Sequence, residues 1–274
     1  MKPILFIPIL ILFISCQKEN DDVTPPPVNE GTLLKSAVTT FGSDSYSYGY
    51  AYGSSNELNK IDFSSQVGGV SKTDKISVFR NGGGIIESYS YKSTAFAALG
   101  LDSILYKVGY NASEKIYTYT VGKYVAAGTP YADSTAFIYS AGNVIDVKTF
   151  SSANGGAYKN QKQQVFTYNS GNIASNKGYT YNSATSQYVL KNEFVYEYDT
   201  KVNPLAIKDE GHVLGILELV SANNSTKGTY TDQVNSANNY IMTWEYTYNS
   251  KNKPLTSVIK YPGSNVTLQT TFNY

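Results

Sequence analysis

The chain has 274 residues, with 22 Lys and Arg against 21 Asp and Glu and a formal net charge of +1. Charged residues make up only 16%, whereas Tyr occurs 26 times and Gly 22 times, a composition far from that of helical proteins rich in Ala, Leu, Glu and Lys. The basic residues are scattered, so the sequence offers no positive surface to hold a nucleic acid backbone. This composition favours an all-β protein and argues against nucleic acid as a partner.

The amino terminus has the pattern of an export signal. Residues 1–15 hold one Lys and then an unbroken apolar run, too short to span a membrane as a mature helix, before the only cysteine, Cys16. We predict a signal peptide over residues 1–15, a lipid on Cys16 and an extended tether over residues 16–31, which contain three consecutive prolines. A lipidated Cys16 leaves no thiol for a disulfide, a nucleophile or a metal.

Two short motifs near this cysteine carry a resemblance. Residues 13–16, Phe-Ile-Ser-Cys, resemble the lipobox of bacterial lipoproteins, in which the cleaved chain begins at a lipidated Cys. Residues 17–22, Gln-Lys-Glu-Asn-Asp-Asp, resemble the acidic signal that sends Bacteroidota lipoproteins to the outer face of the outer membrane. The resemblance implies a protein that is anchored in the outer membrane by its lipid and faces the cell exterior.

Residues 32–274 read as a single Tyr-rich β-domain built on one recurring unit. In residues 244–248, three aromatic side chains alternate with Glu and Thr, the period-two pattern that puts aromatics on one face of a strand. A polar turn, residues 249–252, follows at once. Variants of this unit occupy residues 137–144, 166–173 and 196–204, and a degenerate copy occupies residues 48–58. The sequence therefore predicts a quasi-repeat of β-hairpins.

The spacing of the repeat is regular with one exception. Tyr139, Tyr168 and Tyr198 lie 29 and 30 residues apart (168 − 139 and 198 − 168), whereas Tyr248 follows Tyr198 by 50. Further alternating segments bring the total to roughly 14 to 18 strands in an antiparallel up-and-down meander, which must curl or close into a barrel-like sheet. Only residues 93–100 and 212–222 resist this interpretation, and we expect each to form one or two helical turns at an end of the rolled sheet.

The hairpin units carry a second resemblance. Their Tyr-x-Tyr-Asn/Asp turns are similar to the tyrosine-aspartate repeats of Rhs-type proteins. Residues 196–205, the apolar stretch after them, Asn223-Asn224 and residues 246–255 look like Bacteroidota lipoproteins of unknown function with a porin-like β fold. This resemblance implies a fold and a location, and it brings no functional residues because that family has no established activity.

Few residues offer catalytic or metal chemistry. His212 is the only histidine, which excludes any site that needs two imidazoles. It stands beside Asp209 and Glu210, but this group follows the turn at Asn203-Pro204, and we interpret it as a solvated polar loop. The glycine runs at 82–84 and 155–156 lack the following helix and Lys-Ser/Thr pair of a phosphate loop, so they predict hairpin turns. The sequence thus predicts no catalytic residue, metal site or cofactor.

One enzymatic alternative stays open, because a glycoside hydrolase needs only two carboxylates that folding brings together. Glu87, Glu193, Glu197 and Glu245 lie within strand patterns on the expected polar face. We expect them to be surface charges that limit edge pairing.

The tyrosine ladders have two possible roles. Exposed aromatic faces stack on sugar rings, but alternating Tyr is also favoured by packing between strands. We predict that Tyr168, Tyr198 and Tyr248 occupy equivalent places at strand ends and face a common interior. The sequence does not select the tyrosines that contact a ligand, nor does it give the oligomeric state. The leading hypothesis is a non-catalytic binding or scaffold module for a glycan or a partner protein.

An outer-membrane β-barrel is the remaining alternative. Residues 266–274 alternate and end on an aromatic residue, as the closing strand of such barrels does. A lipid-facing band needs apolar side chains at successive outward positions, whereas most strands here carry Ser, Thr, Asn or Gly on both faces. We therefore favour a domain outside the bilayer.

Overall fold

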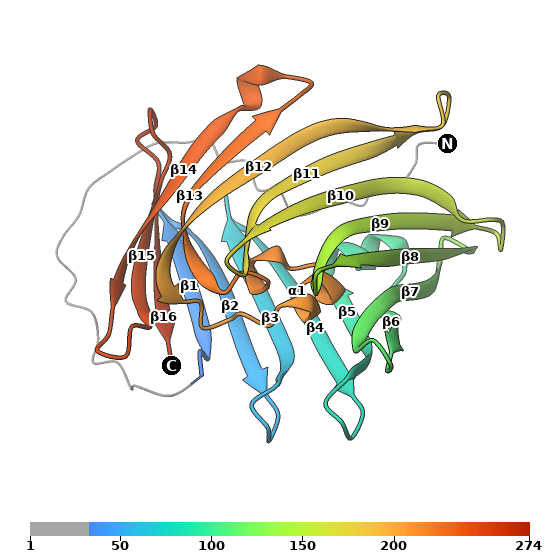
Figure 1. The fold of residues 1–274 in the computed structure, drawn as a ribbon, viewed down its shortest axis with the longest axis horizontal. Coiled ribbons are helices and arrows are strands. Elements are labelled where there is room, and N and C mark those ends of the chain that lie inside the picture. Colours follow the sequence, from blue (N-terminus) through green and yellow to red (C-terminus); the bar gives the residue numbers. More distant parts are fainter. Residues whose placement is uncertain (1–32) are drawn as a thin grey trace.

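The computed structural model describes residues 33–274, so the predicted signal peptide, Cys16 and the whole predicted tether lie outside the described residues. Sixteen antiparallel strands follow one another in chain order around a closed barrel, in which β1 pairs with both β2 and β16 (Figure 1). The predicted up-and-down meander is confirmed, and the sheet closes. All sixteen strands pair with both neighbours within residues 33–274.

The strands are β1 (Ser36–Phe41), β2 (Asp44–Tyr52), β3 (Leu58–Val67), β4 (Val70–Arg80), β5 (Ile86–Ser93), β6 (Ile104–Asn111), β7 (Ile116–Ala126), β8 (Thr129–Ser140), β9 (Asn143–Ala153), β10 (Lys159–Asn169), β11 (Asn172–Asn182), β12 (Gln187–Val202), β13 (Asn223–Asp232), β14 (Tyr240–Tyr248), β15 (Pro254–Lys260) and β16 (Thr267–Asn273). The helical elements are α1 (Asp209–Leu214) and the 3₁₀ turns η1 (Thr94–Leu99), η2 (Leu217–Leu219) and η3 (Ser236–Asn238). Helical turns were expected at the positions of η1 and of α1 with η2. No helix within residues 33–274 is long and apolar enough to cross a membrane.

The two faces of the wall differ in chemistry. Along β3 and β4, Ile61 and Val78 are buried toward the interior, while Lys75 and Ser77, the neighbours of Ile76, point outward. The same alternation recurs around the barrel, because successive side chains in a strand point to opposite faces. The buried apolar and aromatic side chains face inward, while the outer face mixes polar side chains with exposed apolar ones such as Phe79, Leu105 and Ile138.

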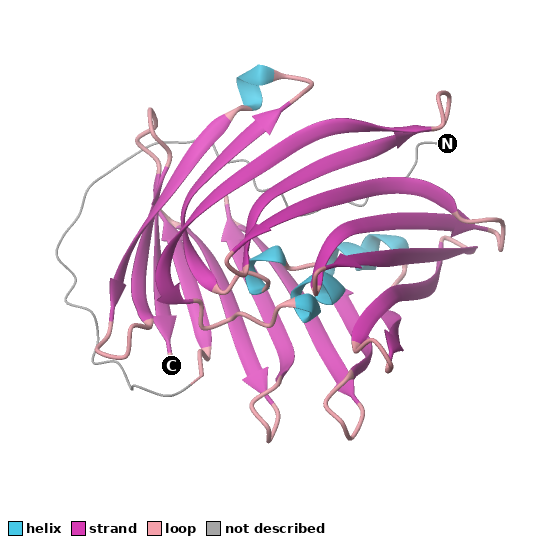
Figure 2. Ribbon diagram, in the orientation of Figure 1, coloured by secondary structure: helices cyan, strands magenta, loops and turns pink. Residues whose placement is uncertain are grey.

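The segment that joins β12 to β13, residues 203–222, lies inside this wall, and we call it the plug. Figure 2 shows its helical turns among the strands. Val213, Leu214, Leu219 and Val220 of the plug are buried in one cluster with inward-facing residues of the wall. The apolar pattern of residues 213–220 therefore packs against the inner wall and fills part of the barrel.

The plug lies at one end of the barrel, which we call the plug end. In an up-and-down barrel every odd-numbered strand starts at the same end, so β1 and β13 start where β12 finishes. The chain therefore enters the barrel at the plug end, and the turns between odd and following even strands, such as β1 to β2, lie at the opposite end.

The repeat unit ends in a strand irregularity that recurs at the plug end. In seven even-numbered strands the register shifts immediately before one inward-facing residue; these residues are Tyr52, Arg80, Tyr110, Tyr139, Tyr168, Tyr198 and Tyr248. We call them the collar. The extra residue of each shift lies in the following odd-numbered strand: Asn59, Glu87, Thr118, Ile145, Ala174, Thr226 and Leu255. The even-numbered strand keeps its alternation, so each collar residue points inward two positions after another inward residue.

The collar explains the irregular spacing in the sequence. Tyr198 and Tyr248 are 50 residues apart, 20 more than the 30 of a regular unit, and residues 203–222 number 20 (222 − 203 + 1). The plug is thus an insertion into an otherwise regular hairpin repeat. The collar also shows a substitution, because Arg80 occupies a position that is Tyr in the other six strands.

Several hydroxyl groups of the collar donate hydrogen bonds to nearby backbone carbonyls of the same chain. Tyr52, Tyr168 and Tyr198 donate to the carbonyls of Leu34, Val144 and Ile173, at 2.9, 2.9 and 2.8 Å. Tyr248 instead donates to the carboxylate of Asp199. The prediction that Tyr168, Tyr198 and Tyr248 are equivalent and face the interior is confirmed, although β12 continues to Val202 beyond Tyr198.

Candidate functional site

The group Asp209-Glu210-Gly211-His212 is not a solvated loop, so that expectation was wrong. It lies in α1 inside the barrel, where Gly211 and His212 are buried. A Cβ at Gly211 would stand 2.8 Å from Val220, so only glycine lets the helix approach the returning chain this closely. Gly215, with φ of 72°, then ends α1 in the left-handed conformation.

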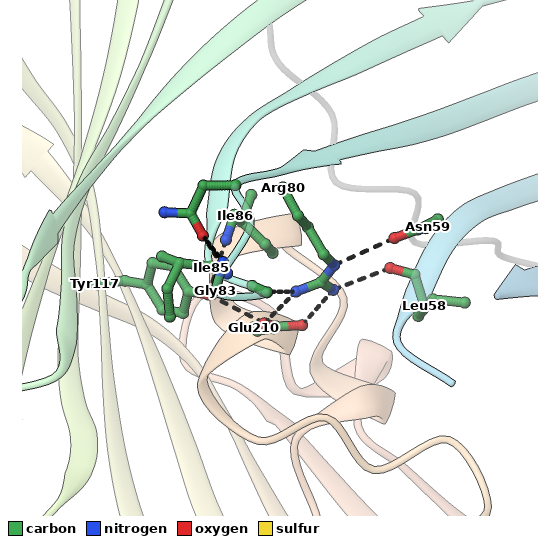
Figure 3. A network of polar contacts seen from close by, with 10 residues as sticks. Leu58, Asn59, Arg80, Gly83, Ile85, Ile86, Tyr117 and Glu210 are labelled. Carbon is green, nitrogen blue, oxygen red and sulfur yellow. Dashed lines mark hydrogen bonds and ion pairs between the residues drawn. The ribbon is translucent and has the colours of Figure 1, made fainter. Parts of the chain in front are cut away.

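Glu210 fixes the plug to the wall through Arg80 (Figure 3). The Arg80 guanidinium donates to both carboxylate oxygens of Glu210, each at 2.7 Å, and also to the carbonyls of Leu58 and Gly84 and to Asn59 Oδ1. The Tyr117 hydroxyl donates to Glu210 Oε1 at 3.0 Å. The side chains of Arg80 and Glu210 are only 7% and 20% exposed. This ion pair holds α1 against β4 and β7.

The charges and hydrogen bonds around Glu210 shift the pKa values of its two neighbours, Arg80 and Tyr117. Burial opposes the charge on Arg80, but the hydrogen bonds and the charge of Glu210 outweigh it, so the pKa of Arg80 is raised above its ordinary value. Burial and the nearby Glu210 carboxylate raise the pKa of the Tyr117 hydroxyl. Arg80 therefore stays charged and the Tyr117 hydroxyl keeps its proton at neutral pH, which indicates a structural role for this network.

His212 is held in the neutral state. Its Nε2 lies 2.8 Å from the hydroxyl of Tyr168, which itself donates to the carbonyl of Val144. The hydroxyl has one proton, so the ring donates from Nε2, and Nδ1, which has no hydrogen-bond partner, carries no proton. A charged ring would bury an unpaired N–H there, and burial lowers the pKa of His212 to about 4. His212 is therefore a packed core side chain.

The glutamates expected on the polar face are there. Glu193, Glu197 and Glu245 lie on the outer wall and pair across strands with Lys177, Lys227 and Lys260, and Glu87 is exposed. The expectation that they limit edge pairing was wrong, because a closed barrel has no edge strand. Glu193, Glu197 and Glu245 instead form cross-strand ion pairs on the outer wall.

Part of the inner wall is not filled by the plug. Tyr48 on β2 points inward with Tyr46 and Tyr50, yet 37% of its surface is exposed. Its ring stacks on that of Tyr50, with centroids 6.4 Å apart and planes at 6°. On β12, Phe194 and Tyr196 stack in the same way, at 5.6 Å and 9°. We call these four rings the inner aromatic surface.

The charge of Glu218 in the plug acts on both halves of this surface. Burial and then the Glu218 carboxylate raise the pKa of Tyr48 on β2 and of Tyr196 on β12. Five strands separate β2 from β12 around the barrel, so this charge acts on two separate parts of the wall. Glu218 is exposed, and its carboxylate takes part in none of the hydrogen bonds or ion pairs formed within residues 33–274. Only its backbone carbonyl is bound, by Asn203 Nδ2 at 2.9 Å.

Residues 33–274 offer few other groups suited to metal binding or catalysis. No group of three or more His, Cys, Asp or Glu side chains within residues 33–274 is placed to hold a metal ion. The glycine runs at 82–84 and 155–156 lie in the β4–β5 and β9–β10 turns, as predicted. Sequence reasoning missed Arg80 and Glu218. The collar register, in which Arg replaces Tyr, was the signal for Arg80, and no local signal marked Glu218.

Solved structures of two porin-like proteins are similar in fold to this chain. A porin-like protein from Bacteroides uniformis, with a solved structure, has a TM-score of 0.53 and 9% identity, over 90% of this chain and 98% of its own. A porin-like protein from Bacteroides vulgatus has a TM-score of 0.54 and 12% identity, over 89% of this chain and 99% of its own. No family model and no curated protein matches the chain.

The likeness is one of fold alone. At such low identity it confirms the expected porin-like β architecture over nearly the whole barrel, and it transfers no residue roles.

Proposed function

We propose that this protein is a lipid-anchored, non-catalytic binding module at the outer surface of the outer membrane, and that its barrel stands in water and takes a glycan against the inner aromatic surface. The observation that carries the proposal is the partly exposed inward face of Tyr48 and its stacked partners above a plugged end. Aromatic rings of this kind supply the flat apolar faces on which sugar rings stack. A folded partner protein fits this site less well, because the surface lies inside the barrel.

The course of the chain supports this arrangement. β1 starts at the plug end, so a tether that runs from a lipid on Cys16 to Ser36 holds the plug end toward the membrane. The opposite end of the barrel then faces the medium, from which a ligand arrives.

The outer wall supports a barrel outside the bilayer. Lys75, Lys107, Lys148 and Lys177 lie near the middle of β4, β6, β9 and β11 and point away from the interior. A Lys on the lipid face at the bilayer midplane costs about 2–4 kcal/mol, so four would cost roughly 10 kcal/mol, which is as much as a typical domain's whole stability.

An outer-membrane barrel is the second candidate, and the closed fold with its porin-like neighbours favours it. Expressing residues 33–274 alone distinguishes the water-exposed barrel from the membrane-embedded barrel. We expect a monodisperse protein without detergent. Recovery only in detergent, with the wall protected from aqueous lysine-modifying reagents, would favour the embedded barrel instead.

Binding is tested on a glycan array with the same protein. Tyr48→Ala should abolish binding of any glycan that the wild-type barrel retains, because it removes an exposed inward ring. Tyr119→Ala is the matched control, since Tyr119 is 47% exposed but lies on the outer wall. Equal binding by both variants would place the site elsewhere. Turnover of a bound polysaccharide would replace the proposal with the carboxylate-pair hydrolase.

A further inference from the structure

One side of the outer wall exposes large apolar side chains on three adjacent strands. These side chains are each between 41% and 57% exposed, and they are Leu105 on β6, Tyr119 and Val125 on β7, and Ile138 on β8. Each stands next to a buried residue of its own strand, so each points away from the interior. The Tyr119 ring lies over Gly109 on β6, where no side chain displaces it, and so joins the two strands on the outside.

Two lysines lie within this apolar area. Lys107 on β6 is directly opposite Val121 on β7, and Lys123 follows Val121 by two residues on the same face. Both lysines are exposed, and neither ammonium group forms a hydrogen bond or ion pair within residues 33–274. We call the following six side chains the outer patch: Leu105, Lys107, Tyr119, Lys123, Val125 and Ile138.

The outer patch carries an excess of positive charge. Asp146 on β9 lies opposite Ile138 at its border, but this carboxylate accepts a hydrogen bond from Gln163 at 2.8 Å and lies 3.6 Å from the ammonium of Lys148. On β12 and β14 the outer wall is different, because each of its carboxylates there pairs with a lysine of the next strand. The two lysines of the patch are therefore available to an anionic partner.

The size of the outer patch decides between kinds of partner. Strands about 4.8 Å apart with a rise of about 3.4 Å per residue give the patch an area of roughly 300 Å². A stable interface with a folded protein, including a second copy of this chain, buries about 800 Å² on each partner, and lysine is depleted in such interfaces. At a membrane surface, by contrast, apolar side chains enter the headgroup region while lysine stems extend beside them and their ammonium groups bind anionic headgroups.

We propose that the outer patch is a membrane-docking surface, on which the barrel rests against a bilayer that carries anionic headgroups. Leu105, Tyr119 and Val125 enter the interface, and Lys107 and Lys123 bind the headgroups. The contact is peripheral and leaves the end of the barrel opposite the plug open to the medium. The predicted tether, residues 16–31, extends to at most about 55 Å, which is long enough to let this wall reach the bilayer. The inference is independent of what the inside of the barrel binds.

The test uses the predicted mature chain, residues 16–274, with Cys16→Ser so that no lipid anchors it. It is sedimented with vesicles of phosphatidylcholine, and with vesicles in which about one third of the lipid is phosphatidylglycerol. We expect at least about tenfold stronger binding to the anionic vesicles and release from them at high salt. Lys107→Glu with Lys123→Glu should weaken this binding roughly tenfold or more, because each lysine near such a surface contributes a factor of about five.

Two matched controls separate docking from general attraction. Lys227→Glu with Lys260→Glu changes the net charge equally, at exposed lysines on β13 and β15, and should keep most of the binding. Leu105→Ser should weaken binding severalfold, whereas Val195→Ser, at an exposed outward position on β12, should not. All variants should keep the wild-type unfolding midpoint, because the changed side chains are exposed.

The outcomes distinguish this proposal from the proposed function. Equal losses in the two lysine double variants, or equal binding to both kinds of vesicle, would overturn the docking surface, as would no binding at all. Protein that stays with the vesicles in high salt and alkaline carbonate would be an embedded barrel, which overturns both proposals. Glycan retention by the Lys107→Glu, Lys123→Glu variant should equal that of the wild type, so a failure of docking alone leaves the proposed function standing.

Discussion

The ion pair between Arg80 and Glu210 makes a sharp prediction about how the plug is held. Arg80→Met removes the guanidinium and leaves the Glu210 carboxylate buried with only the Tyr117 hydroxyl as partner. Breaking one side of a buried pair costs about 3–5 kcal/mol. We therefore expect the free energy of unfolding in urea to fall by about that amount. Lys260→Met, which breaks the exposed pair with Glu245, should cost less than about 1 kcal/mol.

The double variant Arg80→Met with Glu210→Leu tests the reason for this loss. It removes the stranded charge, so it should regain much of the stability that the single variant lost. Hydrogen exchange of residues 203–222 should quicken in Arg80→Met while that of the strands stays slow. The reasoning is refuted if Arg80→Met is no worse than Lys260→Met, or if the two substitutions at the buried pair simply add.

Three further predictions follow from the described contacts. Burial lowers the pKa of His212 from 6.5 to about 4, so the unfolded chain binds more protons than the folded one between these pH values. The free energy of unfolding should therefore fall by about 3 kcal/mol as the pH drops from above 6.5 to 4. His212→Gln should lack this part of the pH dependence, and the same pH dependence in wild type and variant would contradict the prediction. Tyr248→Ala should lower the free energy of unfolding by about 3 kcal/mol, whereas Thr247→Ala, on the outer face, should stay within about 0.5 kcal/mol; similar effects in urea titrations would argue against an inward ring. Gly122→Ala would put a Cβ 2.6 Å from the Tyr106 ring and should destabilise by about 1–3 kcal/mol, unlike Gly49→Ala, whose nearest neighbour is at 3.8 Å; equal unfolding midpoints would show that the wall yields at Tyr106.

Much of the wall could be predicted from the sequence because its signals are local. Period-two alternation, as in residues 244–248, and the polar turns after each aromatic pair predicted the strands and their antiparallel order. The same alternation predicted the face of the sheet on which Glu193 and Glu197 lie. The 50-residue gap between Tyr198 and Tyr248 even marked the insertion that became the plug. Each of these depends on residues within one hairpin, whose geometry a short stretch of sequence largely dictates.

What the sequence by itself determined is thus the alternating strand and the polar turn, since side-chain period and turn chemistry act over a few residues. Only the tertiary structure decided that the sheet closes, that the plug turns inward, and that Asp209 to His212 are enclosed instead of solvated. It also decided the pairing of Arg80 with Glu210, 130 residues away, and the contact of His212 with Tyr168. These contacts join distant segments, and they form only because closing the barrel brings its walls together around the inserted chain.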